Sequence, residues 1–428
     1  MPILTPLCGL RFGPAYARPS AYAPPYDVIG ASERERLLAG DPHNIVHVDL
    51  GPAQTDAAWY QAAAATWAAW RAEGVLVQEA LPSLYGYEQE FALGGRSLTR
   101  RGVLGCVRLA PWGEGIHRHE RTRSGPRLDR LRLMRATRAQ ISPVFGLFRD
   151  DDGAVARWAR PPSAPDLLGA FAAADGVCHR FWRIADPDAI AGLGAALAPS
   201  EIVIADGHHR YETALAYRDE RRAADQPSSP RPYDDVLMYL TDAQAPGVAI
   251  LPTHRVVACP ADTDWGAFLA GLHARGALAQ LDAAGSLSEA LANQPDYGPR
   301  LGIYLGGRGA YVLTLHDPAA AVRAVAPEVP AALAGLDVLA LQHLVLDPLL
   351  GISSEALAHS ERVRYTIRED EARAWVDAGE CQAAFVLNAT TVDQVWQAAT
   401  HGLTLPPKSS YFYPKLLTGL VMHALDGA

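Results

Sequence analysis

The pattern of apolar and polar positions predicts two helices near the start of the chain. The first directly follows an extended, proline-rich segment, and a capping box of Ser32 and Glu35 is expected to open it. Alanine-rich sequence after Thr55 predicts the second helix. Its large residues recur at helical spacing, which is typical of a buried stripe; they are Trp59, Ala63, Trp67 and Trp70.

Strand patterns dominate several later segments. Alternating residues over 84–109 flank Gly94-Gly95, which predicts a β-hairpin. A second hairpin is expected over 301–315, where the sequence GGRG forms the turn rather than a phosphate loop. Residues 202–222 read as a buried strand, a tight turn and a helix, and helices alternate with strands from about residue 259 onward.

These elements predict an α+β fold with mixed sheets and flanking helices. We expect residues 1–258 to form one domain, with a β-rich insertion at about 80–185. Residues 259–428 are expected to form a smaller α/β half packed on the first, and to contribute Lys408 and Lys415.

Composition narrows the function classes. The chain has 428 residues, of which 49% are hydrophobic, and a net charge of −9; this is a globular composition whose charge disfavours a nucleic-acid partner. The five cysteines form no CxxC pair, and the first residues, MPILTPLCGL, lack the basic start of a signal peptide. No apolar run reaches the roughly 20 residues that span a bilayer. We therefore expect a cytoplasmic protein without a membrane partner.

The strongest candidate for chemistry is the turn after the strand of residues 202–205. It comprises Asp206, Gly207, His208, His209 and Arg210. A tight turn before a helix directs backbone N–H groups and the positive end of the helix dipole at one point, which suits a phosphate. The structural alternative is a surface turn with a capping aspartate.

A second candidate is the segment HRHERT, residues 117–122, in a stretch that is rich in arginine. The histidines and Glu120 could hold a metal. The many guanidinium groups favour an anionic substrate or a polyphosphate instead. Asp27 follows two prolines and precedes a helix, so its direction is fixed; it is either a catalytic carboxylate or a turn residue.

Two smaller segments complete the candidates. One is Thr253-His254-Arg255, and the other holds Lys408 and Lys415, the only lysines among 38 basic residues. Retention of lysine in a chain that otherwise uses arginine indicates a need for a compact charge, or chance survival at the surface. The chain has no GxxxxGK[ST] loop, no protein-kinase signature and no GxSxG elbow.

Taken in order, APPYDVI, HRHERT, ISPVFGLF, IADGHHRYETALAYRDE, LPTHR and PPKSSYFYPKLLTGLV resemble a bacterial and archaeal family catalogued as a domain of unknown function. Within it, the DGHHR turn resembles the phosphate-binding box of the ParB/sulfiredoxin superfamily, which includes free serine kinases. In those kinases the box holds nucleotide phosphates, and a carboxylate nearer the N-terminus deprotonates the serine hydroxyl. The kinases carry Glu where this chain has Asp27.

This resemblance implies a ParB/sulfiredoxin-like nucleotide-binding domain and a small-molecule kinase. The enzyme would transfer a phosphoryl group from ATP or ADP, with Mg²⁺, to the hydroxyl of free serine or a related hydroxy amino acid. The implied residues are catalytic Asp27, Glu120 and His119; nucleotide-binding Asp206, Gly207, His208, His209, Arg210, Arg121 and Thr122; and substrate-binding His254, Arg255, Lys408, Tyr411 and Lys415.

Two alternatives of other classes stay open. The first is a ParB-like interaction protein that uses the nucleotide as a switch. The second is a metal-dependent hydrolase whose ligands would be His117, His119, Glu120, His208 and His209. The sequence does not identify the phosphate donor, the acceptor or the oligomeric state.

Overall fold

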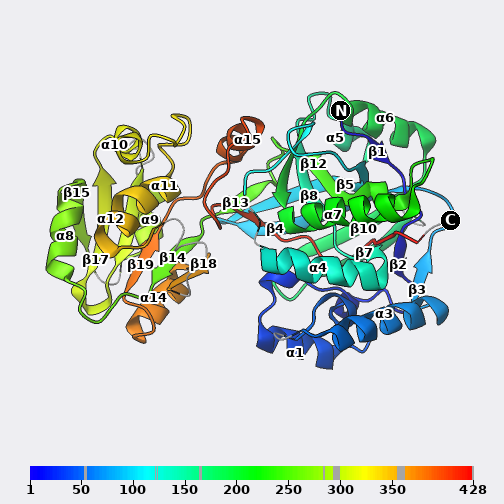
Figure 1. Cartoon of the computed structure of the whole chain (residues 1–428), viewed down its shortest axis with the longest axis horizontal. Helices are drawn as coiled ribbons and strands as arrows, with labels where there is room; N and C mark the ends of the chain where they lie inside the picture. Colours follow the sequence, from blue (N-terminus) through cyan, green and yellow to red (C-terminus); the bar gives the residue numbers. More distant parts are fainter. Residues whose placement is uncertain are drawn as a thin grey trace. The chain divides into compact units, whose positions relative to one another are not determined.

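The chain forms two compact units in the computed structural model. Unit 1 comprises residues 1–118, 122–249 and 414–428, and unit 2 comprises residues 119–121 and 250–413. Each unit has its own sheet and helices (Figure 1). The structure describes residues 1–52, 55–120, 122, 124–162, 166–282, 285–292, 299–353 and 362–426.

Unit 1 is built on a nine-stranded mixed sheet. β11 pairs with β6 and β12 pairs with β8 in parallel, and the other neighbours are antiparallel. In spatial order the strands are β6 (Ile116–His117), β11 (Ile202–Asp206), β8 (Val144–Phe148), β12 (Asp235–Asp242), β5 (Arg96–Arg108), β4 (Leu84–Leu93), β10 (Cys178–Ile184) and β9 (Leu167–Ala172), and β1 (Leu4–Thr5) also pairs with β5.

The predicted hairpin is the β4–β5 pair. Gly94 and Gly95 connect the strands with φ angles of 57° and 74°. Glycine has no Cβ and adopts two successive positive φ angles at little steric cost, which explains the turn. The strands expected at about 80–185 therefore belong to the same sheet as β11 and β12.

Helices cover the sheet of unit 1. α4 lies between α3 and α7, and it contacts both (Figure 1). The helices are α1 (Ala31–Gly40), α2 (Val46–Asp49), α3 (Ala57–Ala72), α4 (Ser124–Thr137), α5 (Ala154–Trp158), α6 (Pro187–Leu197) and α7 (His208–Asp225).

The tryptophan-rich helix is α3, and its buried stripe is confirmed with one change. Ala63, Trp67 and Trp70 are buried, but Tyr60 rather than Trp59 completes the stripe. The predicted capping box at Ser32 is wrong. α1 begins at Ala31 after an N-cap of Gly30, so Ser32 already lies inside the first turn and cannot cap it.

Unit 2 contains a six-stranded antiparallel sheet. In spatial order its strands are β15 (Gly276–Leu281), β17 (Ala310–Leu315), β16 (Arg300–Tyr304), β19 (Ala383–Val386), β14 (His254–Val257) and β18 (Val363–Thr366). The predicted turn at GGRG connects β16 to β17 through a 3₁₀ turn, Gly306–Arg308.

The helices of unit 2 surround this sheet, and one of them is irregular. α11 (Asp337–Leu341) continues through a π-helical turn, Gln342–Leu346, into α12 (Asp347–Leu350). The remaining helices are α8 (Trp265–His273), α9 (Leu287–Ala292), α10 (Pro318–Val325), α14 (Glu369–Asp377) and α15 (Val392–Thr400). The α+β class with mixed sheets and flanking helices is confirmed.

The two units differ from the predicted domains of residues 1–258 and 259–428. The change of unit falls at residues 249–250, and residues 414–428, including Lys415, belong to unit 1. The end of the chain returns there because β21 (His423–Ala424) pairs with β7 (Ala139–Gln140). Such long-range pairing leaves no mark in a local sequence pattern.

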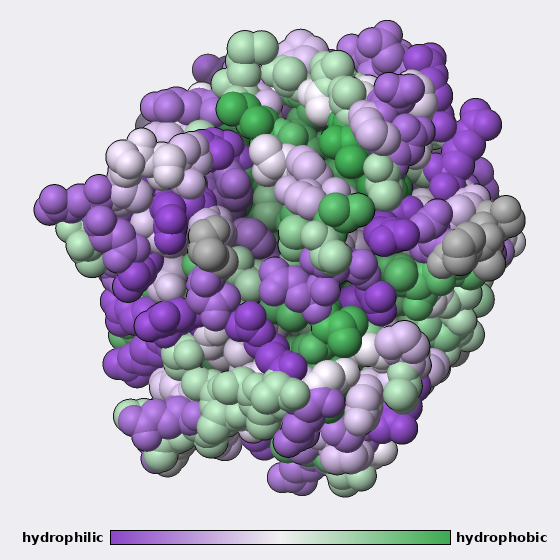
Figure 2. All heavy atoms as spheres, turned by 90° about the vertical axis from the view of Figure 1, so that its right-hand side faces the viewer, coloured by the Kyte–Doolittle hydropathy of each residue, from purple (hydrophilic) through white to green (hydrophobic). Residues whose placement is uncertain are grey.

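Two further features of the structure are the distribution of hydropathy over one molecular face and the apolar character of the helices. The molecular face seen from the right-hand side of Figure 1 carries hydrophilic side chains over much of its rim, and apolar side chains gather toward its middle (Figure 2). Among the described residues, none of the helices combines the length and the apolar character that crossing a bilayer requires.

Candidate functional site

The predicted strand, turn and helix are present in unit 1. β11 is buried over Ile202–Ala205, Gly207 follows Asp206 with a φ of 90°, and α7 begins at His208. A side chain at Gly207 would be strained by this backbone conformation. Its Cβ would also lie 2.9 Å from the guanidinium of Arg210. Glycine therefore lets Arg210 fold back over the turn.

Asp206 binds two cations at this turn. Its Oδ2 accepts a hydrogen bond from Arg210 at 2.5 Å, and its Oδ1 accepts one from Nζ of Lys415 at 2.5 Å. Burial alone would raise the pKa of Asp206, but the charges of Lys415 and Arg210 outweigh burial and hold the pKa well below its usual range. Asp206 is thus an ionised carboxylate shared by two cations.

Arg210 also ties the turn to the segment that precedes β8. It donates to Oγ of Ser142 at 2.7 Å and to the carbonyl oxygen of Pro143. Oγ1 of Thr418 donates to Ser142 at 3.3 Å. The segments ISPVF and DGHHR, which are far apart in the sequence, meet at Ser142.

Two buried side chains hold the backbone of Lys415. Gln89 donates to the carbonyl oxygen of Lys415 at 2.9 Å, and Arg100 donates to that of Pro414. Gln89 and Arg100 face each other across the β4–β5 hairpin and are hydrogen-bonded to each other. Sequence reasoning missed both residues, although two polar side chains paired across a predicted hairpin were a usable signal.

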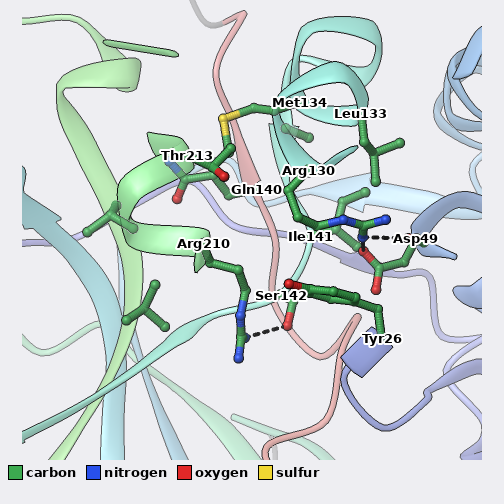
Figure 3. A pocket seen from close by; sticks show the side chains of 13 residues that line it. Tyr26, Asp49, Arg130, Leu133, Met134, Gln140, Ile141, Ser142, Arg210 and Thr213 are labelled. Atoms are coloured by element: carbon green, nitrogen blue, oxygen red, sulfur yellow. Dashed lines mark hydrogen bonds and ion pairs between the residues drawn. The ribbon is translucent and has the colours of Figure 1, made fainter. Parts of the chain in front are cut away.

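A small cavity lies beside Arg210 and Ser142 (Figure 3). Its volume is about 40 Å³. The wall is mainly apolar with a few polar groups, a composition common in ligand sites. The lining residues are Tyr26, Asp49, Arg130, Leu133, Met134, Ala139, Gln140, Ile141, Ser142, Val144, Arg210, Thr213 and Val236.

Arg130, Asp49 and Tyr26 form one side of this cavity (Figure 3). Arg130 is buried, and it donates to Oδ1 of Asp49 at 3.1 Å and to Oδ2 of Asp129 at 2.6 Å. Its guanidinium carbon lies 4.2 Å from the centre of the Tyr26 ring. Burial raises the pKa of Asp49 even though Arg130 acts to lower it.

Asp27 lies next to this wall, on the 3₁₀ turn Tyr26–Val28. Its side chain is exposed, and it is not among the residues that line the cavity. The structure thus brings the APPYD segment to the cavity through Tyr26, with Asp27 on the solvent side.

The remaining predicted residues of unit 1 lie around the start of α7. His208 is buried and His209 is half-buried. Oγ1 of Thr122 donates to Glu212, which also accepts a hydrogen bond from Arg118 at 3.1 Å. Glu212, one turn after His208, fixes this part of the HRHERT segment against α7 and was missed by sequence reasoning. Arg121 lies outside the described residues.

Six of the predicted residues that the structure describes belong to unit 2. Nε2 of His119 lies 2.7 Å from Oγ of Ser410. Arg255 is buried and donates to the carbonyl oxygens of Thr253 and Lys408. Burial lowers the pKa of His254 to about 4. The six residues are His119, Glu120, His254, Arg255, Lys408 and Tyr411.

A metal centre finds no support in the described part of the chain. There, no three side chains among His, Cys, Asp and Glu are grouped so that they could hold an ion. The alternative hydrolase with ligands at His117, His119, Glu120, His208 and His209 therefore has no ligand cluster among these residues.

Among the comparisons with known proteins, the match to a protein family is informative, and the matches to solved structures are remote. No curated protein matches the chain. A conserved hypothetical protein from Pyrococcus furiosus is 12% identical, with coverage of 74% of this chain and 92% of the other and a TM-score of 0.33. A free serine kinase in complex with AMP is 12% identical (73% and 86% coverage, TM-score 0.34), and C-terminally truncated SbnI from Staphylococcus aureus is 10% identical (74% and 85% coverage, TM-score 0.34).

TM-scores of this size carry no argument about activity, so the assignment depends on the family comparison. Residues 4–339 match the model of the family described as "Protein of unknown function (DUF1015)". The match covers well over half of the chain and includes both APPYD and DGHHR. The chain therefore belongs to the DUF1015 family.

Proposed function

We propose that the protein is a phosphotransferase that moves a phosphoryl group from ATP or ADP to the hydroxyl of free serine or a related hydroxy amino acid. The proposal places the transferred phosphates at the start of α7. The DGHHR turn, in its resemblance to the phosphate box of the free serine kinases, supports this placement.

The observation that carries the proposal is the meeting of Arg210 and Lys415 on Asp206 at the start of an 18-residue helix. A guanidinium, an ammonium and the positive end of a helix dipole are the groups that bind phosphate oxygens in proteins. Asp206 keeps both cations in place in the free protein. An incoming phosphate would take over some of their hydrogen bonds.

The reaction needs a nucleophile that loses a proton. The hydroxyl oxygen of the acceptor forms a bond to the terminal phosphorus, and the bond from that phosphorus to the bridging oxygen breaks, so the shortened nucleotide leaves with the electron pair. The hydroxyl proton passes to a carboxylate. Asp27 is the proposed base because its segment reaches the cavity through Tyr26, and Glu120, assisted by His119, is the rival.

The other predicted residues keep their proposed roles. His208, His209, Arg121 and Thr122 would bind the nucleotide with the rest of the box. The substrate residues proposed in unit 2 are His254, Arg255, Lys408 and Tyr411.

Mg²⁺ does not fit a site made by the described side chains alone. These side chains include no three-ligand cluster, and both oxygens of Asp206 are bonded to cations. Magnesium in nucleotide enzymes is commonly held by few carboxylates, phosphate oxygens and water. The ion would therefore arrive with the nucleotide, and no step of the reaction is derived through it.

Phosphorus NMR of the purified protein tests the function. Serine, threonine and homoserine are each incubated with ATP, ADP or pyrophosphate, with Mg²⁺ present. The expected result is a new phosphomonoester signal that needs both a donor and a hydroxy amino acid. Nucleotide binding without any phosphoryl transfer would contradict the proposal and favour the nucleotide-switched interaction protein.

A further inference from the structure

Asp49 is a buried carboxylate that the proposed phosphate chemistry leaves unused. It ends the short helix α2, it is 5% exposed, and it lines the cavity beside Arg210 (Figure 3). Its Oδ1 accepts a hydrogen bond from Arg130. Among the described residues, none donates a hydrogen bond to Oδ2 of Asp49, and this atom is not sealed off as a buried polar atom without a partner.

The cavity limits the size of what Asp49 can bind. A volume of about 40 Å³ is room for about three water molecules, on the scale of roughly 10–15 Å³ for each. A nucleoside is too large for it. The backbone of a small amino acid, or its ammonium group, is of the right order.

The two guanidinium groups of the cavity are already bonded to other side chains, so Oδ2 of Asp49 is the group that can accept a hydrogen bond from a ligand. Arg130 is held by Asp49 and Asp129, and Arg210 is held by Asp206 and Ser142. Both guanidinium groups therefore have anionic or hydroxyl partners already. A buried carboxylate oxygen that faces an open volume is costly unless a donor reaches it, and a cationic donor forms the strongest such hydrogen bond.

We propose that Asp49 binds the ammonium group of the acceptor, and so restricts the reaction to hydroxy acids that carry an amine. This inference rests on the proposed phosphotransferase function and names the substrate class of the same site. Asp49 is a specificity-determining residue here, and the proton of the hydroxyl still goes to Asp27.

The competing explanation is that Asp49 only fixes Arg130 in place. Asp129 offers a matched control, because it also accepts from Arg130 but its side chain is one-third exposed and bonded to Tyr60 rather than facing the cavity. A purely structural role predicts similar effects of Asp49→Asn and Asp129→Asn. Ammonium recognition predicts an effect of Asp49→Asn that depends on the amine of the substrate.

The experiment compares serine with 3-hydroxypropanoate, which has the same hydroxyl and carboxylate but no amine. Titration calorimetry gives the affinity of each compound in the presence of ADP, and steady-state kinetics give KM and kcat. For Asp49→Asn we expect serine affinity to fall by about ten- to a hundredfold, since a charge-assisted hydrogen bond is lost. Affinity for 3-hydroxypropanoate and for ADP should stay within about twofold, and Asp129→Asn should behave like the unmodified protein.

Several outcomes would overturn the inference. They are equal losses for serine and 3-hydroxypropanoate in Asp49→Asn, unchanged serine affinity, or the same profile in Asp129→Asn. If Asp49→Asn does not fold, the unmodified protein decides, since equal affinity for the two compounds contradicts amine recognition. Failure of the proposed function is a separate result: serine and ADP would bind, and Asp49→Asn would still weaken serine, but no phosphate would be transferred.

Discussion

The arginines that line the cavity of unit 1 and the buried Arg255 of unit 2 have different partners. In unit 1, Arg130 and Arg210 are each bonded to at least one carboxylate beside the cavity. In unit 2, the described hydrogen bonds of Arg255 go to main-chain carbonyl oxygens, and its guanidinium carbon lies 5.7 Å from the centre of the Tyr365 ring. Burial lowers the pKa of Arg255 to about 10.

This difference distinguishes arginines that can exchange a carboxylate partner for a ligand from an arginine that only connects parts of the fold. A guanidinium that is bonded to a carboxylate already has the geometry that a phosphate or a ligand carboxylate needs. A guanidinium that is bonded to carbonyl oxygens fixes loops; here it joins Thr253 to Lys408. The contrast supports chemistry in unit 1, and the substrate role of Arg255 stays a prediction.

The largest effect is expected on turnover, and it tests which unit carries the catalytic base. Asp27→Asn keeps the shape of the side chain but removes its basicity, so turnover should fall by roughly 10²–10⁴ while nucleotide affinity is kept. Initial rates and ADP calorimetry measure the two quantities. Normal turnover in Asp27→Asn, together with an inactive Glu120→Gln that still binds nucleotide, would move the base to unit 2.

The next largest effect is expected on the free energy of unfolding when the ion pair of Arg130 and Asp49 in unit 1 is broken. Arg130→Met leaves Asp49 buried without its cation, which should lower the free energy of unfolding by about 3–5 kcal/mol. Urea denaturation followed by fluorescence measures this value. A loss below about 1 kcal/mol would show that Asp49 is not held by Arg130 in solution. The double variant Asp49→Leu/Arg130→Met removes both charges and should recover part of the loss.

Each unit also contains a buried histidine whose pKa lies far enough below its usual value to keep the ring neutral near pH 7. Burial lowers the pKa of His179 in unit 1 and of His254 in unit 2 to about 4. The unfolded chain takes up protons near pH 6.5, so stability is complete above that pH and falls between pH 6.5 and 4. Each histidine accounts for at most about 3 kcal/mol of this loss.

Substitution assigns this pH dependence to a residue. His179 stacks on Phe171 at a centroid distance of 5.4 Å, so His179→Phe keeps an aromatic ring and removes the titrating group. The variant should lose less stability than the natural sequence between pH 7 and pH 5, measured by urea denaturation at each pH. An identical loss would mean that His179 titrates normally.

The smallest effect on the free energy of unfolding is expected for Arg255 in unit 2. Arg255→Met removes two hydrogen bonds to carbonyl oxygens but also removes the cost of burying a charge, so the stability change should stay below about 2 kcal/mol. The same denaturation experiment as for Arg130→Met gives the comparison. A loss as large as that of Arg130→Met would remove the distinction between the two arginines.

Local features of the fold could be predicted because their causes are local. Gly94 and Gly95 impose a tight turn, and Asp206-Gly207 ends a buried strand before an amphipathic helix. The capping box at Ser32 failed by a single residue, since a helix start depends on backbone angles that composition does not fix.

Long-range partners could not be predicted. Lys415 was recognised as unusual, but its bond to Asp206 depends on a chain end that returns to unit 1 and on Gln89 and Arg100, which hold its backbone. Asp49 carried no motif at all. Its position in the cavity follows from packing of α2 on α3, and Arg130 of α4 reaches it there.

Nucleotide affinity of Arg210→Ala tests the central claim most directly. Helix α7 supplies a control in Arg221, which forms an ion pair of the same four-residue spacing, but in the reverse order, with Asp225 near the other end of the helix. Titration calorimetry with ADP should show binding weakened by about 1.5–3 kcal/mol in Arg210→Ala, the value of a charge-assisted hydrogen bond, and unchanged in Arg221→Ala. Equal ADP affinity in Arg210→Ala and the natural sequence would remove the DGHHR turn from the phosphate site.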